Sequence, residues 1–236
     1  MCGIAGWVNF GESIRDKTKI MEEMSKTLSP RGPDEKGFFY SDSCDLAHVR
    51  LTIIDPENGK QPMTKENYTV CYNGELYNTD ELQKELEALG YRFGGHSDTE
   101  VLLISYLQWG EKCLDRLNGI YAFAVWDSAR KRLFAARDRA GVKPFYYAFT
   151  SHGLLFASEP KALLKHPEIK PIIDEEGISQ IMLLGPAVKP DSGIFRDIKQ
   201  LPPGCCLNYD KGVFSMSCYW HPTAEPHYES PEETAE

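Results

Sequence analysis

The sequence predicts an α+β fold in which antiparallel strands are layered against a few helices. Short apolar runs bounded by turn residues recur along the 236-residue chain, and such runs are typical of antiparallel strands. A few other segments repeat their apolar residues with helical spacing. A chain of this length can bury a large core as one domain without disulfides or metals.

The first half of the chain mixes both kinds of element. Strands are expected at 3–8, 36–40, 44–54 and 68–72, with a turn at Asn73-Gly74 closing the last of them. Helices are expected at 17–28, at 79–89 and from Ser97 onward. The pairs Asn78 with Glu81 and Ser97 with Glu100 have capping-box spacing and mark the starts of the last two helices.

The second half is richer in short strands. Strands at 121–126, 132–136, 145–149 and 154–157 have the spacing of one antiparallel meander. Short helices are expected at 161–165 and 175–184, and late strands at 195–198 and 206–209. Arg137, Asp138 and Arg139 are expected to form a buried ion-pair network beside the meander. Residues 222–236 are rich in Pro, Glu, Ser and Thr, which predicts a linker.

Composition narrows the classes of function. The net charge of -9 disfavours nucleic-acid and membrane-surface partners, because an acidic surface repels phosphate groups. No run reaches the length of a transmembrane helix, and the N-terminus lacks the pattern of a signal peptide. The odd number of cysteines, seven, without a C-x-x-C pair predicts free thiols in a reducing cytoplasm and no metal site.

Cys2 is the candidate nucleophile. A small residue at position 2 favours removal of Met1, which would place a thiol and a free α-amine on one residue. An α-amine has a pKa of about 7.7–8.0, so it can take the thiol proton and later pass a proton to a leaving amine. The competing interpretation is a small apolar residue at a frayed terminus, and Cys2 alone does not decide between them.

Three further positions carry candidate groups for amide chemistry. The Asn73 side chain and the Gly74 backbone offer two neighbouring N–H donors for an oxyanion, although Asn-Gly is also a leading hairpin signal. Arg50 could grip a carboxylate, or it could be a strand-edge arginine or part of a structural ion pair. Asp98 could accept an α-ammonium group, or it could simply be an acid in the first turn of a helix.

Six motifs resemble one known family. After the opening Met-Cys-Gly-Ile-Ala-Gly, the chain contains RGPD at 31–34, RLTIID at 50–55, YNGELYN at 72–78, SDTEVLL at 97–103, RDRAGVKPFYY at 137–147 and FASEPKAL at 156–163. In this order they resemble the glutaminase domain of glutamine-hydrolysing asparagine synthetases, which are class II glutamine amidotransferases. The resemblance covers residues 2–221 and implies a four-layer αββα sandwich of the N-terminal-nucleophile hydrolase type.

The resemblance also implies roles for individual residues. Cys2 matches the nucleophile, with Asn73 and Gly74 as the oxyanion-hole pair. Arg50 matches the residue that holds the glutamine α-carboxylate. Asp98 and Glu75 match residues near the α-amino group, with Glu75 acting through its backbone, and the backbone around Ile53 completes the pocket.

The expected activity is hydrolysis of L-glutamine to glutamate and ammonia, with no cofactor or metal in this chain. In the family, a C-terminal synthetase domain uses the ammonia, ATP and Mg²⁺ to convert aspartate to asparagine. The sequence lacks that domain's Ser-Gly-Gly-x-Asp-Ser loop, which predicts a truncated chain in which residues 222–236 lead toward it. Two alternatives remain, the glutaminase domain of another amidotransferase and a silent regulatory or binding domain. A homodimer is also left open.

Overall fold

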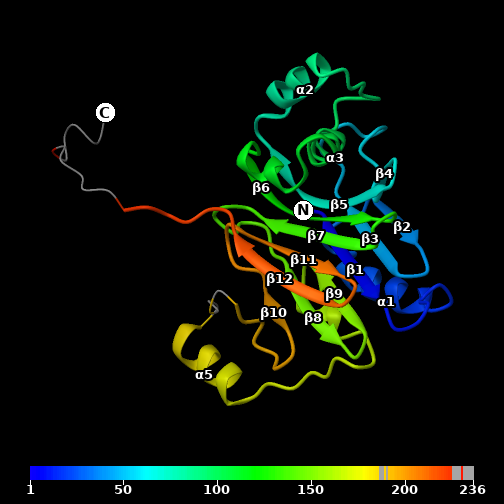
Figure 1. Cartoon of the computed structure of the whole chain (residues 1–236). Helices are drawn as coiled ribbons and strands as arrows, with labels where there is room; N and C mark the ends of the chain where they lie inside the picture. Colours follow the sequence, from blue (N-terminus) through cyan, green and yellow to red (C-terminus); the bar gives the residue numbers. More distant parts are fainter. Residues whose placement is uncertain (186–188, 190, 225–229, 231–236) are drawn as a thin grey trace.

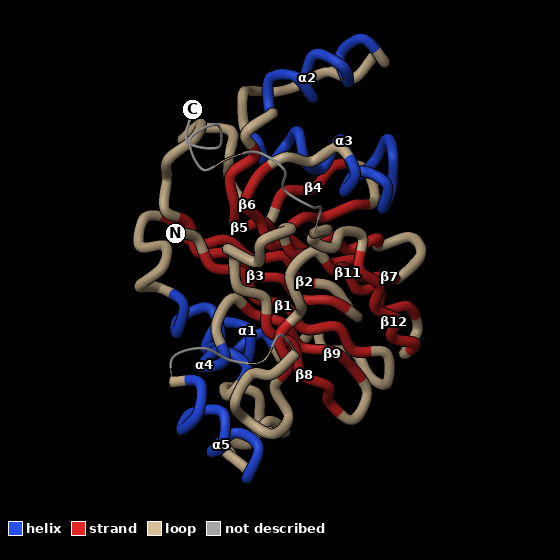
Figure 2. The backbone as a smooth tube through the Cα atoms, turned by 90° about the vertical axis from the view of Figure 1, so that its left-hand side faces the viewer, coloured by secondary structure: helices blue, strands red, loops and turns tan. Residues whose placement is uncertain are grey.

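Two stacked antiparallel sheets form the centre of the protein in a computed structural model that describes residues 1–185, 189, 191–224 and 230. Helices cover the outer face of each sheet, which gives four layers (Figure 1). Figure 2 shows the strands between α2 and α3 on one side and α1 and α4 on the other. The predicted α+β, four-layer αββα sandwich is confirmed.

The first sheet contains the N-terminal strand near its centre. Among the described residues its strand order is β10-β8-β9-β1-β3-β2, and every neighbouring pair is antiparallel. The strands are β1 (Gly3–Asn9), β2 (Glu35–Tyr40), β3 (Cys44–Arg50), β8 (Tyr146–Thr150), β9 (Gly153–Ala157) and β10 (Lys199–Gln200). Both β1 and β3 are buried throughout, but only β1 reads as a nearly continuous apolar run, because β3 also buries Asp45, His48 and Arg50.

The second sheet is assembled from the middle and the end of the chain. Its order within the described residues is β12-β11-β7-β6-β5-β4, again antiparallel throughout. The strands are β4 (Met63–Lys65), β5 (Tyr68–Leu76), β6 (Gly119–Asp127), β7 (Arg132–Arg137), β11 (Cys205–Asp210) and β12 (Val213–Cys218). The strand β5, which pairs with β6 along its whole length, carries residues that form one wall of the candidate site.

The helices follow the predicted positions closely. They are α1 (Thr18–Leu28), α2 (Thr79–Ala88), α3 (Asp98–Trp109), α4 (Pro160–Leu163) and α5 (Glu175–Leu184), with a 3₁₀ helix at Gly110–Asp115 extending α3. The two predicted capping boxes are wrong, because neither Asn78 nor Ser97 makes a side-chain cap. The Asn78 side chain instead bonds the backbone of Arg116 and Asn118, so a tertiary contact replaces the local one.

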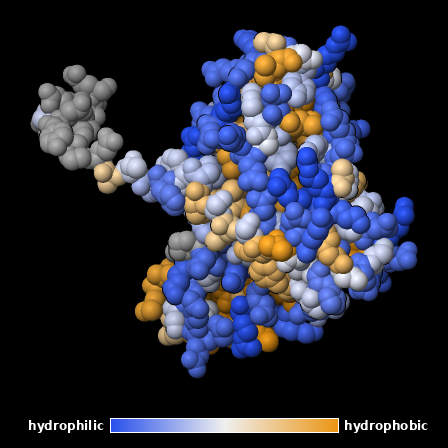
Figure 3. Space-filling model, in the orientation of Figure 1, coloured by the Kyte–Doolittle hydropathy of each residue, from blue (hydrophilic) through white to orange (hydrophobic). Residues whose placement is uncertain are grey.

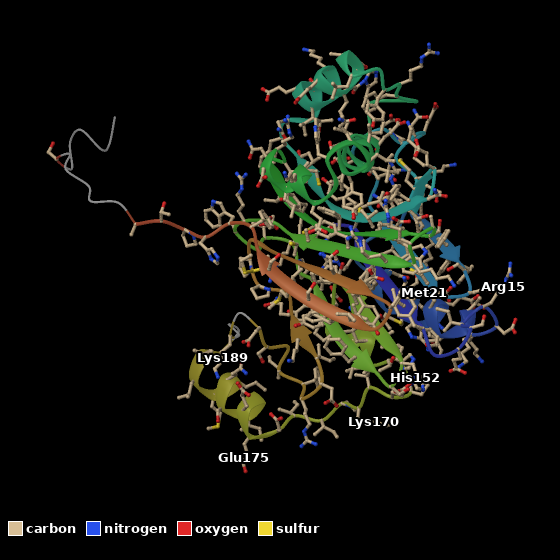
Figure 4. The ribbon with its side chains drawn as sticks, viewed as in Figure 1. Arg15, Met21, His152, Lys170, Glu175 and Lys189 are labelled. Atoms are coloured by element: carbon tan, nitrogen blue, oxygen red, sulfur yellow. A yellow bond between two sulfur atoms is a disulfide. The ribbon has the colours of Figure 1, made fainter. Side chains whose placement is uncertain are left out.

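Three apolar clusters separate the four layers. One lies between the second sheet and α2 and α3, and includes Tyr72 and Leu102. A second lies between the two sheets. A third lies between the first sheet and α1 and α4, where Met21 is fully buried while Arg15 points outward (Figure 4). Each cluster gathers the apolar side chains of one face, as strand alternation and helix periodicity require.

The predicted single meander is wrong. The strands β6 and β7 pair with each other in the second sheet, whereas β8 and β9 pair in the first. The chain crosses between the sheets after Arg137, and regular strand spacing carries no information about such a crossing. The expected strand at 195–198 is also absent from the described structure, where only Lys199–Gln200 pairs with β8.

The expected turn at Asn73-Gly74 is wrong as well. Both residues lie inside β5 and pair with Ala122 and Tyr121 of β6. Gly74 is required by this close pairing, since a Cβ there would lie 2.5 Å from the Ile120 carbonyl oxygen. Tertiary pairing overrides the local turn preference of Asn-Gly.

The corner after β7 is built from hydrogen bonds instead of ion pairs. The Arg137 guanidinium donates to the carbonyls of Lys143, Leu201 and Gly141 at 2.6–2.7 Å. The Asp138 carboxylate accepts four backbone N–H bonds, from Tyr121, Ala140, Val142 and Lys143. No ion pair of the described residues joins Arg137, Asp138 or Arg139 to one another. The predicted ion-pair network is therefore wrong, and hydrogen bonds of Arg137 and Asp138 to the backbone take its structural role.

Two cysteines form a disulfide, so the prediction of seven free thiols is wrong for Cys205 and Cys218. These residues face each other directly in the antiparallel β11–β12 pair. The sequence analysis did not predict β12, and without its register the pairing was not visible. Cys2, Cys44, Cys71, Cys113 and Cys206 remain free.

One helix differs from the others in its surroundings. The outer face of α5 exposes apolar side chains, with Met182 and Leu183 about four-fifths exposed, and hydrophobic atoms gather there in Figure 3. Figure 4 places Glu175, at its first residue, and Lys189, beyond its end, away from the sheets. Only Gly177 and Gln180 of this helix are buried.

Most of the predicted linker at 222–236 lies outside the described residues, and 222–224 have no regular secondary structure. The domain boundary at 221 therefore stays a prediction. Within the described part of the chain, no helix combines the length and the apolar character needed to cross a membrane.

Candidate active site

A cleft that opens to solvent lies where five chain segments meet. They are the segment before β1, the end of β3 with the loop after it, the strand β5, the start of α3, and the loop after β7 at Lys143. All seven predicted site residues line this cleft: Cys2, Arg50, Ile53, Asn73, Gly74, Glu75 and Asp98. The structure therefore brings them together, while their individual roles stay predictions.

Cys2 is anchored on both sides, so the frayed-terminus interpretation is wrong. Its Sγ accepts a hydrogen bond from the Leu51 backbone N–H at 3.4 Å, and its carbonyl accepts one from Arg31 Nε at 2.8 Å. Cys2 is partly exposed, whereas the other four free thiols are buried and burial raises their pKa values. Among the free cysteines, Cys2 therefore has both the access and the fixed position that a nucleophile needs.

Asn73 carries an unused donor. The residue is 1% exposed, and its side-chain nitrogen has no hydrogen-bond partner among the described residues. Buried polar nitrogens are rarely left unpaired, because the lost hydrogen bond to water is costly. Asn73 and Gly74 line the same cleft as Cys2, so the unpaired amide is available to an oxygen of a bound ligand.

Arg50 is more constrained than the sequence analysis expected. The terminal nitrogens of its guanidinium already donate to the carbonyls of Ile54, Asp55 and Pro56 and to Glu35 Oε2, which lies 2.9 Å from Nη1. A ligand carboxylate would have to replace some of these acceptors or bind beside them. Arg50 forms a structural ion pair with Glu35 and also lines the cleft, so the structural interpretation and the ligand-binding interpretation do not exclude each other.

Asp98 is the first residue of α3 and is only 5% exposed. Burial raises its pKa, while hydrogen bonds from the Tyr72 hydroxyl and from the backbone of Leu76 and Thr99 act in the opposite direction. No ion pair of the described residues includes Asp98, so its buried carboxylate has no cationic partner of its own. The position of Asp98 therefore fits both interpretations, an acid in the first turn of a helix and an acceptor for an α-ammonium group in the cleft.

The remaining predicted residues are placed at the rim. Glu75 is exposed, which fits a role through its backbone, and Ile53 is 75% exposed in the loop after β3. Within the described residues, no group of three or more His, Cys, Asp or Glu side chains is placed to hold a metal ion. The expectation that this chain needs no metal or cofactor stays a prediction.

Two residues that line the cleft, and one that supports Cys2 from outside its lining, escaped the sequence analysis. Arg31 was interpreted only as part of a turn, yet it holds the Cys2 carbonyl and pairs with Glu159 at 3.0 Å. Tyr72 was quoted in the YNGELYN motif without a role. Lys143 lines the cleft and its ammonium contacts the Met1 sulfur at 3.6 Å. The motifs contained these residues, but their partners are distant in sequence and no local signal revealed them.

A family model described as a glutamine amidotransferase domain matches residues 1–220. The chain belongs to this family. The match spans the two sheets, the helices and every residue of the cleft, so the family assignment rests on the same part of the chain as the geometry above.

Curated relatives are asparagine synthetases. The chain is 48% identical over 238 residues to the glutamine-hydrolysing asparagine synthetase 3 of Bacillus subtilis (strain 168), covering 99% of this chain and 39% of that protein. It is 38% identical over 209 residues to asparagine synthetase 1 of the same organism, covering 86% of this chain and 33% of that protein. The chain thus spans well under half the length of these relatives.

Solved structures support the fold. A glutamine phosphoribosylpyrophosphate amidotransferase from B. subtilis, complexed with ADP and GMP, matches with a TM-score of 0.66 and 19% identity over 93% of this chain and 49% of that chain. A structure described as the allosteric regulatory enzyme of purine biosynthesis matches with a TM-score of 0.68 and 18% identity, at the same coverage. At these identities the likeness establishes the sandwich architecture alone.

Proposed function

We propose that this domain hydrolyses L-glutamine to glutamate and ammonia through a γ-glutamyl thioester on Cys2. The observation that carries the proposal is the buried, unpaired Asn73 amide beside a partly exposed thiol in one cleft. The membership of the chain in the glutamine amidotransferase family supports the substrate class.

The proposed reaction needs two chemical steps. After removal of Met1, the Cys2 α-amine takes the thiol proton and Sγ attacks the side-chain amide carbon of glutamine. The Asn73 side chain and the Gly74 N–H stabilise the oxyanion, and the C–N bond breaks as the protonated amine returns its proton to release ammonia. Water then cleaves the thioester, which yields glutamate and restores the thiol.

The contacts of Cys2 favour this role. The Leu51 N–H donor at 3.4 Å stabilises negative charge on sulfur, and Arg31 fixes the backbone from which the thiol projects. In the substrate complex, Asp98 receives the α-ammonium group, Arg50 the α-carboxylate, and the backbone of Glu75 and of the loop at Ile53 closes the pocket. These contacts are parts of the proposal.

The wider role is proposed from the relatives. In a longer polypeptide, the ammonia would pass to a synthetase domain that uses ATP and Mg²⁺ to convert aspartate to asparagine, with no cofactor needed in this chain. The names and the greater length of the relatives support this acceptor over that of another amidotransferase. We further propose that residues 222–236 form the linker to that domain. A homodimeric assembly and a cytoplasmic location are also parts of the proposal. The Cys205–Cys218 disulfide removes the argument from free thiols for the cytoplasmic location.

The first prediction concerns Cys2. Replacing Cys2 with Ala should reduce glutamate release from L-glutamine on the order of 10⁴-fold, because no other group can form the thioester. The measurement is enzymatic detection of glutamate and ammonia from purified protein. Cys206→Ala is the matched control, since that buried thiol lies outside the cleft and its loss should leave turnover unchanged.

Two results would count against the proposal. Turnover at the parental rate in Cys2→Ala would remove Cys2 as the nucleophile. An intact mass that retains Met1 in an active preparation would remove the α-amine as the base, because that nitrogen would then belong to a peptide bond.

A further inference from the structure

Tyr72 precedes Asn73 in β5 but contributes to a different wall of the cleft. Consecutive side chains of a strand point to opposite faces of the sheet. Tyr72 packs with Val70 and Leu76 in the apolar cluster against α3, whereas Cys71 belongs to the cluster between the sheets. Asn73 has the same parity as Cys71. The strand β5 therefore directs the Tyr72 side chain toward the first turn of α3 and the side chain of the next residue, Asn73, toward the other sheet.

The Tyr72 hydroxyl is bonded to the carboxylate of Asp98. The Tyr72 oxygen donates to Asp98 Oδ2 at 2.9 Å, with Tyr72 2% exposed and Asp98 5% exposed. A phenol has one hydrogen to donate, and this contact uses it. The bond stabilises the ionised carboxylate against the burial that would otherwise neutralise it.

The backbone of Tyr72 is fixed from two sides. Its N–H donates to Gln61 Oε1 at 2.6 Å, and its carbonyl accepts from His48 Nε2 at 3.1 Å. Gln61 also donates to Thr99 Oγ1 at 3.1 Å, in the first turn of α3. The phenol and the carboxylate are thus tied to each other through a second path, which limits how far either can move.

We propose that Tyr72 is a positioning residue that orients the Asp98 carboxylate for the α-ammonium group of the substrate. With one carboxylate oxygen held by the phenol, the orientation of the other is fixed. No ion pair of the described residues compensates Asp98, so a substrate cation would be its partner. This inference rests on the proposed function and extends it, because it makes Tyr72 responsible for selecting substrates that carry a free α-amino group.

The inference separates two substrates. L-Glutamine carries the α-ammonium group, whereas its des-amino analogue, glutaramate, has the same side-chain amide and carboxylate without it. Loss of the Tyr72 hydroxyl should therefore weaken binding of glutamine and leave glutaramate unaffected. A purely structural role would weaken both substrates alike.

The experiment compares Tyr72→Phe with the parent on both substrates. For glutamine, KM should rise about tenfold, the size expected for a hydrogen bond to a charged group, with kcat within about twofold. For glutaramate, kcat/KM should not change. Tyr106→Phe is the matched control, because it removes another nearly buried hydroxyl from the same apolar cluster, one bonded to Arg132 and outside the cleft.

A double-mutant cycle tests the route of the effect. In an Asp98→Asn background, Tyr72→Phe should cause no further loss of glutamine affinity, since the two residues act as one unit. Equal losses on both substrates, additive losses in the cycle, or an unchanged glutamine KM in Tyr72→Phe would each overturn the inference.

Binding to Cys2→Ala separates this inference from the proposed function. Calorimetric titration of L-glutamine into Cys2→Ala, with and without Tyr72→Phe, needs no turnover and should show the same tenfold loss. Weakened binding in the double variant together with an inactive parent would contradict only the hydrolysis. Unchanged binding in the double variant would contradict only the role of Tyr72. Glutamine binding to neither variant would contradict both.

Discussion

Two buried polar clusters in this protein use the same kinds of side chain in opposite ways. At the corner after β7, Asp138 accepts four backbone N–H bonds and Arg137 donates three bonds to carbonyls. In the cleft, the Asn73 amide nitrogen is unpaired and Asp98 lacks a cationic partner among the described residues. All four side chains are at most 6% exposed, so burial alone does not distinguish the clusters.

The difference lies in unused hydrogen-bonding and charge capacity. A polar group that finds all its hydrogen-bond partners within the protein stabilises the fold. Removing it leaves several other buried polar groups without a hydrogen-bond partner. A polar group that is buried without a partner lowers stability and persists where a ligand completes it. The comparison therefore predicts that substitutions in the cleft change activity and that substitutions at the corner change stability.

Within this comparison, the largest expected effect belongs to Asn73. Asn73→Ala should lower kcat for glutamine by about 10²–10³-fold, the loss typical of one oxyanion-hole donor. Thermal stability should change little, because the lost nitrogen makes no hydrogen bond to any described residue. Steady-state kinetics and thermal unfolding of the same preparation measure both quantities.

Asn208→Ala provides the control for this prediction. Asn208 lies on β11, and its buried Oδ1 also has no hydrogen-bond partner among the described residues, but it does not line the cleft. Its replacement should leave kcat unchanged. If the two variants lose activity equally, the unpaired amide of Asn73 has no special role in catalysis.

The next effect should appear at the corner. Asp138→Asn replaces two acceptor oxygens by one and turns an N–H₂ group toward backbone donors, which should lower the free energy of unfolding by about 3 kcal/mol. Asp98→Asn also loses one acceptor oxygen, but it removes a buried charge that lacks a cationic partner among the described residues, so it should destabilise the protein less than Asp138→Asn does. Urea denaturation of both variants measures the contrast. A larger destabilisation in Asp98→Asn would reverse the assignment of the two clusters.

Residue patterns predicted local elements better than they predicted pairing. The five helices and most strand cores were visible from apolar spacing and turn residues, but β4 and β12 were not predicted. The crossing between the sheets after Arg137 and the opposition of Cys205 to Cys218 were not visible, since both depend on which strands become neighbours. At Asn73-Gly74 the local pattern predicted a turn, whereas pairing with β6 keeps the segment extended.

The candidate site shows the same limit. All seven residues that the sequence analysis named as catalytic or binding candidates line the cleft, because nucleophile, donor and charge types are recognisable in sequence. The supporting contacts were missed, since Arg31 reaches Cys2 across 29 positions and Tyr72 reaches Asp98 across 26. Such contacts exist only once the sheets are stacked.

Asp45 tests whether unused capacity is by itself a sign of function. This carboxyl on β3 is fully buried and accepts one hydrogen bond from the Ser41 N–H at 3.3 Å, and no described residue bonds its Oδ2. The indole nitrogen of Trp7, its cross-strand neighbour, also has no partner in the described part of the chain. Neither residue lines the cleft, so we expect Asp45 to affect stability and not turnover.

The effect of Asp45 should depend on pH. Burial raises its pKa from 3.8 to about 7, so the folded protein keeps the carboxyl neutral over a range in which the unfolded chain ionises it. The unfolded state therefore binds fewer protons between about pH 4 and pH 7, and stability falls as pH rises through that window.

Asp45→Asn cannot ionise. Its free energy of unfolding should exceed that of the parent on the order of 2 kcal/mol at about pH 8, with little difference near pH 4. Urea denaturation at both pH values measures this, and a difference that does not vary with pH would mean that Asp45 is not neutral in the folded protein. Loss of glutamine turnover in this variant would instead show that an unpaired buried carboxyl matters for catalysis even outside the cleft, which would break the distinction between the two clusters.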